Sequence, residues 1–134
     1  MPTQVGAVTF DCHDPVAIAA FWATALSYEP YKAGVWDDRV ADSKASYLAD
    51  PTGVGPNLFF IEVPESKVVK NRVHLDLLPE TSMEAEVERL TAAGAHALTT
   101  IQESEDVPDP WIWTVMQDPE GNEFCVGEPL SRRA

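Results

Sequence analysis

Asp50-Pro51-Thr52-Gly53 has a second copy at Asp118-Pro119-Glu120-Gly121, and this repeated turn decides how the chain is interpreted. Aspartate first, proline second and glycine fourth are the residue preferences of a type I turn. A short predicted strand follows each turn, at residues 58–61 and 123–126. The repeat therefore predicts two copies of one structural unit rather than two unrelated halves.

Hydrophobic periodicity predicts the same order of elements in each copy, because alternation indicates strands and an i, i+3, i+4 spacing indicates helices. In the first copy we expect a helix at 15–26, a loop at 36–43 and strands at 5–12, 28–36, 45–49 and 58–61. Because Pro30 cannot donate a backbone hydrogen bond, the strand at 28–36 should be irregular or lie at the edge of its sheet. In the second copy we expect strands at 71–77, 96–101, 111–116 and 123–126, a helix at 82–93 after the capping box Thr81-Ser82-Met83-Glu84, and an acidic loop at 102–110 that is a candidate lid. The fold class is α+β, with two β-α-β-β-β modules at about 4–64 and about 70–128 in a single domain, residues 1–134.

The composition is that of a globular protein and argues against some partners. The 134 residues are 45% hydrophobic and carry a formal net charge of -13. Nucleic acids and anionic membranes bind basic surfaces, so we expect neither as a partner. No secretory signal is visible at the N-terminus, and we expect a cytoplasmic protein. The predicted strand phases place Cys12 and Cys125 on opposite faces, which disfavours a disulfide.

Several polar side chains follow one another in Asn71-Arg72-Val73-His74-Leu75-Asp76. On a strand, Arg72, His74 and Asp76 project from one face and the apolar residues project from the other. This polar face is either solvated, or a structural network, or a site in which Asp76 fixes the tautomer of His74.

Two tryptophans share one face of the strand predicted at 111–116. Trp111 and Trp113 follow the acidic loop, and this pattern suits the wall of a pocket for a flat organic ligand. The alternative is that both rings belong to the core, as most aromatic residues on strands do. The negative charge of the loop favours a neutral or cationic ligand over an anion.

Four stretches together resemble the glyoxalase / bleomycin-resistance / dioxygenase proteins, the vicinal oxygen chelate superfamily, and within it the small glyoxalase-like domains. They are Asp11-Cys12-His13-Asp14-Pro15 leading to Phe21-Trp22, Val63-Pro64-Glu65, Lys70-Asn71-Arg72-Val73-His74-Leu75-Asp76, and Asp118-Pro119-Glu120-Gly121-Asn122-Glu123-Phe124-Cys125. The resemblance implies that the sheets of the two modules curl into a half-open mixed β-barrel around a central cleft. It also places Trp36, Phe60, Trp111 and Trp113 around that cleft. Related proteins often pair, so the resemblance leaves a homodimer open.

Metal-dependent members of that superfamily place ligands on the first and last strands of each module. His74 matches the first-strand position of module two, and Cys125 stands at the last-strand position, where a catalytic glyoxalase usually carries glutamate. The corresponding positions of module one hold poor ligands, namely Ala7 or Thr9 on the first strand and Phe60 or Ile61 on the last, with Glu62 one further shift away.

This ligand set argues against the glyoxalase I reaction, which needs a metal with open positions and a carboxylate base. His13 and His96 are expected on the surface. We therefore expect no cofactor. The alternative is one divalent metal ion held by His74 and Cys125, with help from Asp76 or Glu62. If no metal binds, Cys125 is either a residue of the pocket or a buried inert thiol.

Two functions remain open on these grounds. In the first, the chain binds and sequesters a small organic molecule, such as an antibiotic or a metabolite, through ligand-binding residues Arg72, Trp36, Phe60, Trp111, Trp113 and Cys125. In the second, it is an enzyme, a metal-dependent lyase, isomerase or dioxygenase centred on His74, with Asp76 as its catalytic partner. The missing metal ligands favour the first.

Overall fold

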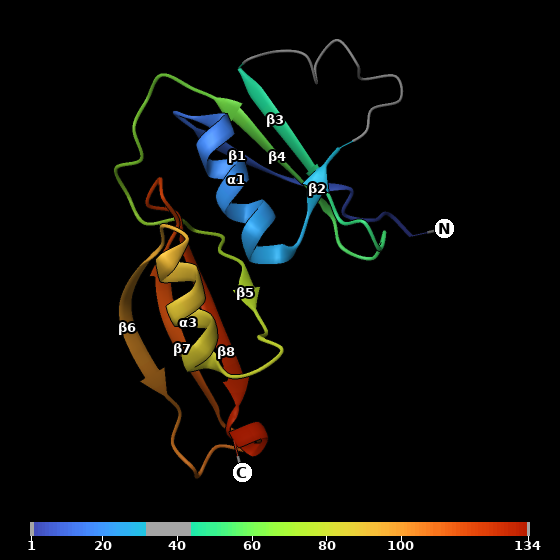
Figure 1. The fold of residues 1–134 in the computed structure, drawn as a ribbon. Coiled ribbons are helices and arrows are strands. Elements are labelled where there is room, and N and C mark those ends of the chain that lie inside the picture. The colour runs from blue at the N-terminus through green and yellow to red at the C-terminus, as the bar shows by residue number, and fades with distance from the viewer. Residues whose placement is uncertain (1, 32–43, 134) are drawn as a thin grey trace. The chain divides into compact units, whose positions relative to one another are not determined.

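The chain forms two compact units, Met1–Ser66 and Lys67–Ala134, in a computed structural model that describes residues 2–31 and 44–133. The described part of each unit follows the order β-α-β-β-β, with one α-helix and a four-stranded mixed sheet (Figure 1). The α+β class and the duplicated module are therefore confirmed. Neither helix in the described ranges has the length and apolar run that crossing a membrane requires.

The first unit contains β1 (Ala7–Cys12), α1 (Pro15–Leu26), β2 (Glu29–Pro30), β3 (Ala45–Ala49) and β4 (Asn57–Glu62). Its strands lie in the order β1-β4-β3-β2, with β1 parallel to β4 and the other pairs antiparallel. Helix α1 packs on β3 and β4. Strand β2 lies at the edge of the sheet, as Pro30 predicted, and the rest of the strand and loop expected at 32–43, including Trp36, lies outside the described residues.

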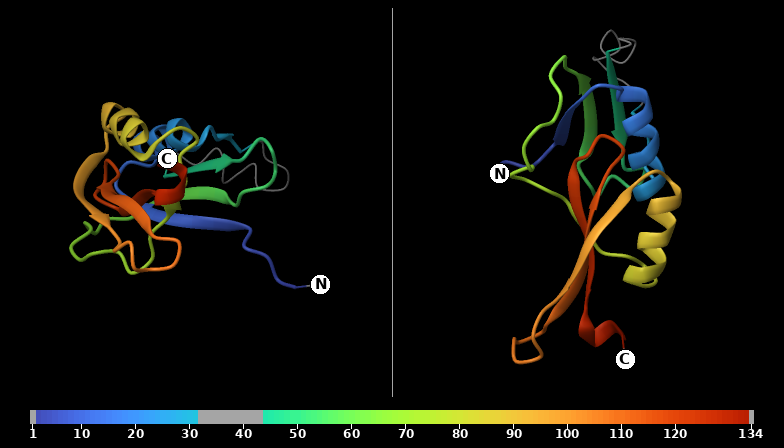
Figure 2. Two further views of the ribbon diagram at one scale, coloured as in Figure 1. Left: turned by 90° about the horizontal axis from the view of Figure 1, so that it is seen from below. Right: turned by 90° about the vertical axis from the view of Figure 1, so that its left-hand side faces the viewer.

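The second unit contains β5 (Asp76–Leu77), α3 (Met83–Ala92), β6 (His96–Gln102), β7 (Trp111–Gln117), β8 (Glu123–Pro129) and a 3-10 helix, η1 (Leu130–Arg133). Its strand order, β5-β8-β7-β6, repeats that of the first unit, and again the first and last strands are parallel. In both units the helix lies along one face of its own sheet (Figure 2). The opposite face of the second sheet is where the candidate site lies.

The repeated turn has the same geometry in both units. The Gly53 N–H donates to the Asp50 carbonyl oxygen at 3.0 Å, and the Gly121 N–H donates to the Asp118 carbonyl oxygen at 2.9 Å. Both glycines have a positive φ, +75° and +85°, which a residue without a Cβ adopts at little cost. The turn on which the fold prediction depended is therefore present twice.

Helix α1 begins and ends where its sequence predicts. The Asp14 side chain caps its N-terminus by accepting the Ala17 N–H at 3.1 Å, and Ser27 ends it in the left-handed conformation. Its buried Trp22 packs against Phe10, with ring centroids 5.5 Å apart, and Phe10 packs against Phe60 at 5.2 Å. These three rings form the core under α1.

The strand predicted at 71–77 is mostly wrong, because only Asp76 and Leu77 pair with β8 as a strand. Val73, expected on the buried face, is 78% exposed. The alternation of apolar and polar residues is a local pattern, so it cannot reveal that Asn71 is bound by two distant side chains, Glu123 of β8 and Asn122 just before it. The backbone N–H of Asn71 donates to Glu123 at 2.8 Å, and its amide donates to Asn122 at 3.0 Å. These bonds leave the intervening segment irregular.

The predicted capping box is also wrong by one residue. Ser82, not Thr81, caps α3 by accepting the Ala85 N–H at 3.1 Å. Glu84 does not reach back to the cap, because its carboxylate pairs with Arg133 of η1. The sequence pattern missed η1, which supplies this competing partner, and it also missed the last three residues of β8.

Candidate functional site

A pocket of about 490 Å³ lies in the second unit, and we call it the tryptophan pocket. Its lining comes from β5, β7, β8 and the segments that flank β5 and β6, and consists of His74, Asp76, Leu77, Leu78, Glu103, Trp111, Trp113, Cys125 and Gly127. Four of these are among the residues that the sequence nominated on strand phase alone, namely His74, Asp76, Trp111 and Trp113. Pockets of this volume, mostly apolar with a few polar groups, are typical of small-molecule sites.

Strand β7 divides its side chains cleanly between the two faces of the sheet. Ile112, Thr114 and Met116 are buried, and Thr114 donates its hydroxyl to the sulfur of Met83 at the start of α3. Trp111 and Trp113 therefore lie on the face away from the helix. Trp111 is 37% exposed and Trp113 is partly exposed, so both indoles are available to a ligand.

Strand β8 supplies the floor between the tryptophans and β5. Phe124, Val126 and Glu128 alternate toward α3, so Cys125 and Gly127 face the pocket. Gly127 is the register partner of Trp113 on β7. A glycine here leaves room for the indole to lie close to the sheet.

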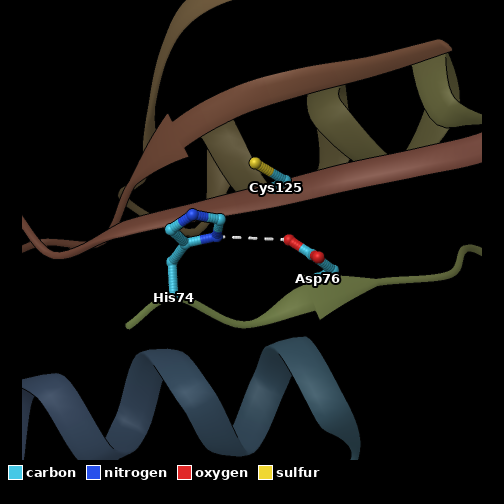
Figure 3. A group of neighbouring side chains, drawn as sticks. All are labelled: His74, Asp76 and Cys125. Carbon is cyan, nitrogen blue, oxygen red and sulfur yellow. Dashed lines mark hydrogen bonds and ion pairs between the residues drawn. The ribbon is translucent and has the colours of Figure 1, made fainter. Parts of the chain in front are cut away.

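Three of the lining side chains have metal-binding or acid–base chemistry and lie close together, as Figure 3 shows. Asp76 and Cys125 are direct register partners in the parallel β5–β8 pair, and the Cys125 N–H donates to the Leu75 carbonyl oxygen at 2.9 Å. His74 Nδ1 lies 3.3 Å from Asp76 Oδ1. One ligand atom from each of His74, Asp76 and Cys125 lies within 4.8 Å of the others.

The surroundings of Cys125 keep its thiol protonated. Burial raises the pKa of Cys125, and the neighbouring Asp76 raises it further through its negative charge and a hydrogen bond. Lys70 acts in the opposite direction and lowers the pKa less. A thiol with a raised pKa is a weaker nucleophile at neutral pH than an ordinary cysteine.

An ion pair between an exposed lysine and a buried glutamate anchors the segment that carries His74. Glu123, 9% exposed, accepts hydrogen bonds from Lys67 Nζ at 2.9 Å and from the Asn71 N–H at 2.8 Å. Burial alone would raise the pKa of Glu123, but the bonds from Asn71 and Lys67 outweigh it and lower that pKa to about 2. Glu123 thus holds both ends of the 67–71 segment against β8, three residues before His74.

Glu103 and Gly127 line the pocket although the sequence did not nominate either. Glu103 Oε1 accepts the backbone N–H of Trp111 at 2.9 Å, so the carboxylate is held beside the first tryptophan. The acidic loop at 102–110 was the available signal for Glu103, but nothing in it distinguished Glu103 from its acidic neighbours. No local signal identified Gly127.

Other nominated residues lie elsewhere. Phe60 is 0% exposed in the core under α1, which corrects its assignment to a ligand-binding wall. Arg72 is exposed and does not line the tryptophan pocket. Glu62 ends β4 of the first unit. His13 and His96 are exposed, as expected, and His13 lies 3.0 Å from the Glu65 carbonyl oxygen.

Solved structures with this fold are similar to the chain over nearly its whole length. A glyoxalase/bleomycin resistance protein/dioxygenase family enzyme from Burkholderia phytofirmans PsJN has a TM-score of 0.68 and 17% identity, and the match covers 93% of this chain and 98% of that one. The fosfomycin resistance protein FosX from Listeria monocytogenes, complexed with Mn(II) and 1S,2S-dihydroxypropylphosphonic acid, has a TM-score of 0.66 and 14% identity, with 94% and 90% covered. A glyoxalase-related enzyme from Fulvimarina pelagi has a TM-score of 0.65 and 18% identity, with 94% and 88% covered.

At these identities the structures establish the fold, and the sequence itself establishes the family. No curated protein matches the chain. The sequence model of the glyoxalase-like domain family matches residues 7–127, which is nearly the whole chain and includes both modules and the tryptophan pocket. The chain therefore belongs to the glyoxalase-like domain family.

Proposed function

We propose that this chain binds a small, flat organic molecule in the tryptophan pocket, as a sequestering protein does. The observation that carries the proposal is that Trp111 and Trp113 both lie on the face of the sheet opposite α3 and both line the pocket. Two partly exposed indoles on one strand offer stacking surface that the fold itself does not need, because the core of this unit lies on the other face.

Two further observations support binding rather than thiol chemistry. The Cys125 thiol is protonated at neutral pH because its pKa is raised by burial and by Asp76. The FosX structure, which holds Mn(II) and an organic phosphonic acid, supports only the coarser point that this fold can accommodate a small organic molecule. An antibiotic or a metabolite of the size of one fused ring system would suit a pocket of about 490 Å³.

Titration with planar aromatic compounds tests this function. A ligand that stacks on the indoles should quench tryptophan emission saturably and raise the melting temperature by mass action. Trp113→Ala should weaken binding by roughly 1–3 kcal/mol while the protein stays folded. Leu98→Ala is the matched control, because Leu98 is an exposed apolar residue of β6 that does not line the pocket. A parent protein that no planar compound quenches, together with a Trp113→Ala variant that cannot fold, would return both rings to the core.

A second candidate function is metal-dependent chemistry, and the His74–Asp76–Cys125 cluster favours it. An imidazole, a carboxylate and a thiolate with a fourth position open form a donor set that suits a catalytic zinc site. The residues therefore fit a divalent metal ion. His74 would bind it by a ring nitrogen, Asp76 by a carboxylate oxygen and Cys125 by its sulfur after losing the thiol proton. The metal would supply Lewis acidity.

Elemental analysis distinguishes the two candidates. Under the binding function we expect the purified protein to contain no stoichiometric transition metal. About one Zn, Ni, Fe or Mn per chain, lost in His74→Ala, would instead place the enzyme first. His96→Ala is the control, because His96 is an exposed histidine of β6 outside the cluster, and this variant should keep any specifically bound metal.

A further inference from the structure

The charged groups that line the tryptophan pocket are mostly of one sign. Asp76 and Glu103 contribute two carboxylates, and His74 and Cys125 are the other titratable residues of the lining. Within residues 2–31 and 44–133, which the structure describes, no lysine or arginine lines the pocket. Lys70 is near enough to affect Cys125 electrostatically, but it does not line the pocket. An anionic ligand would therefore meet two carboxylates without a basic side chain in the wall to pair with.

The sheet places these carboxylates on both sides of the indoles. Asp76 belongs to β5 and Glu103 directly follows β6, and β5 and β6 are the two edge strands in the order β5-β8-β7-β6. The tryptophans lie on β7, between the edges. A ligand stacked on the indoles would consequently have one carboxylate toward each edge of the sheet.

Both carboxylates are also held by hydrogen bonds. Glu103 accepts the backbone N–H of Trp111 at 2.9 Å, and Asp76 Oδ1 lies 3.3 Å from His74 Nδ1. Each of these contacts involves only part of the carboxylate, and Asp76 remains 76% exposed. The negative charges are therefore positioned beside the aromatic surface while keeping oxygen atoms available to a ligand.

We propose that the tryptophan pocket selects a planar organic cation, such as a quaternary nitrogen heteroaromatic, over neutral and anionic molecules of the same shape. The proposal rests on the proposed binding function and names its ligand class. Indole faces attract cations through the ring quadrupole, and the two carboxylates add a Coulomb attraction of the same sign. Phosphonic acids such as the FosX ligand belong to the class that this pocket disfavours.

Three ring-matched probes test the charge preference while holding shape constant. N-methylacridinium is a cation, acridine is neutral at pH 8, and acridine-9-carboxylate is an anion. Isothermal titration calorimetry of the full chain should give a dissociation constant for N-methylacridinium at least about 5-fold below that for acridine, with acridine-9-carboxylate weakest. The cation preference should shrink as salt is added, because the carboxylates are partly exposed.

Charge-neutralising variants show whether the pocket or the whole acidic chain attracts the cation. Glu103→Gln keeps an oxygen that can accept the backbone N–H of Trp111 but removes the negative charge. The preference for N-methylacridinium over acridine should therefore fall. Glu105→Gln is the matched control, because it changes the net charge equally in the same loop without touching the pocket lining. It should leave the preference unchanged.

Each outcome decides one claim. Equal affinities for the three probes, or tightest binding of acridine-9-carboxylate, would overturn the cation proposal and leave the binding function standing. An equal loss of preference in Glu103→Gln and Glu105→Gln would also overturn it, because the attraction would then come from the net charge. Absence of binding by all three probes and by other planar compounds would overturn the binding function itself, and the cation proposal with it.

Discussion

Trp113 and Gly127 are register partners across the β7–β8 pair, and only a glycine allows the two strands to approach as they do there. A Cβ on residue 127 would lie 2.7 Å from Trp113 Cβ and 2.9 Å from the Ile112 carbonyl oxygen. Both distances are shorter than a Cβ atom can approach another heavy atom without a steric clash. The Ile112 oxygen belongs to the backbone and Trp113 Cβ is bonded directly to it, so a side-chain rotation cannot relieve the clash. The absence of a side chain at Gly127 therefore allows the Trp113 Cβ, and with it the indole, to lie in its present position.

Gly127→Ala should displace Trp113 and deform the pocket floor. We expect a loss of about 1–3 kcal/mol in the free energy of unfolding, measured by urea denaturation, because the new methyl group overpacks the strand pair. Binding of any ligand that stacks on Trp113 should weaken as well. Gly6→Ala is the control, because a Cβ there has no heavy atom within 4 Å and should change neither quantity. Unchanged stability and affinity in Gly127→Ala would show that β7 and β8 separate easily.

Asp76→Asn should lower the pKa of the Cys125 thiol. Burial raises that pKa and will remain in the variant, but the negative charge of Asp76 will be lost, and the amide oxygen of asparagine is a weaker acceptor for the thiol proton. The pKa can be measured from the pH dependence of alkylation by iodoacetamide in a Cys12→Ala background, which leaves one thiol. Glu105→Gln controls for the change in net charge. A thiol pKa that is identical in the parent and in Asp76→Asn would mean that Asp76 does not influence Cys125.

Glu123→Gln should flatten the acid dependence of stability. The folded pKa of Glu123, about 2, lies below its ordinary value of 4.5, so the carboxylate stabilises the fold at neutral pH. This contribution is lost as the pH falls from about 4.5 toward about 2. At pH 7 the variant should be less stable than the parent by roughly 1–3 kcal/mol, and the difference should disappear in acid. Glu88→Gln, an exposed change on α3, should reproduce the parent curve.

Arg133→Met should destabilise α3 and η1 together. Glu128, 2% exposed, accepts the Met83 N–H at 2.9 Å and the Arg133 guanidinium at 2.8 Å. Without Arg133, the buried Glu128 carboxylate loses its cationic partner, so urea denaturation should show a lower free energy of unfolding than in the parent.

Two further variants show whether that loss comes from the carboxylate. Adding Glu128→Gln to Arg133→Met should recover part of the stability, because the uncompensated charge is then gone. Arg132→Met should cost little, because Arg132 is an exposed residue that donates to the Glu80 carbonyl oxygen at the surface. A double variant no more stable than Arg133→Met would rule out this account.

Much of the fold could be predicted because the signals that specify it are local. Asp50 and Asp118 form their turns with residues three positions away, and Asp14 caps α1 within its own first turn. Such contacts can be inferred from spacing in the sequence alone. The cap of α3 was misassigned because Glu84 has a stronger partner, Arg133, which no local pattern places beside it.

The site could be predicted only where strand phase decides the answer. Trp111 and Trp113 were correctly placed on one face because β7 alternates regularly. Phe60 was misplaced because both faces of β4 are apolar, and periodicity does not say which face α1 will cover. Glu103 and Gly127 were missed because they enter the pocket through the pairing of β6, β7 and β8. The register between two strands depends on how they pair, so it cannot be inferred from the sequence of either strand alone.

The parallel pairing of β5 with β8 also makes the pocket a late product of folding. These strands come from opposite ends of the second unit, with α3, β6 and β7 between them, whereas β6–β7 and β7–β8 are local hairpins. Contacts between distant segments form slowly because the intervening loop must first be closed at an entropic cost. During refolding, the ability to bind ligand should therefore appear after the hairpins have formed. A ligand that bridges Asp76 and Trp113 would then slow unfolding by holding in place the strand that joins last.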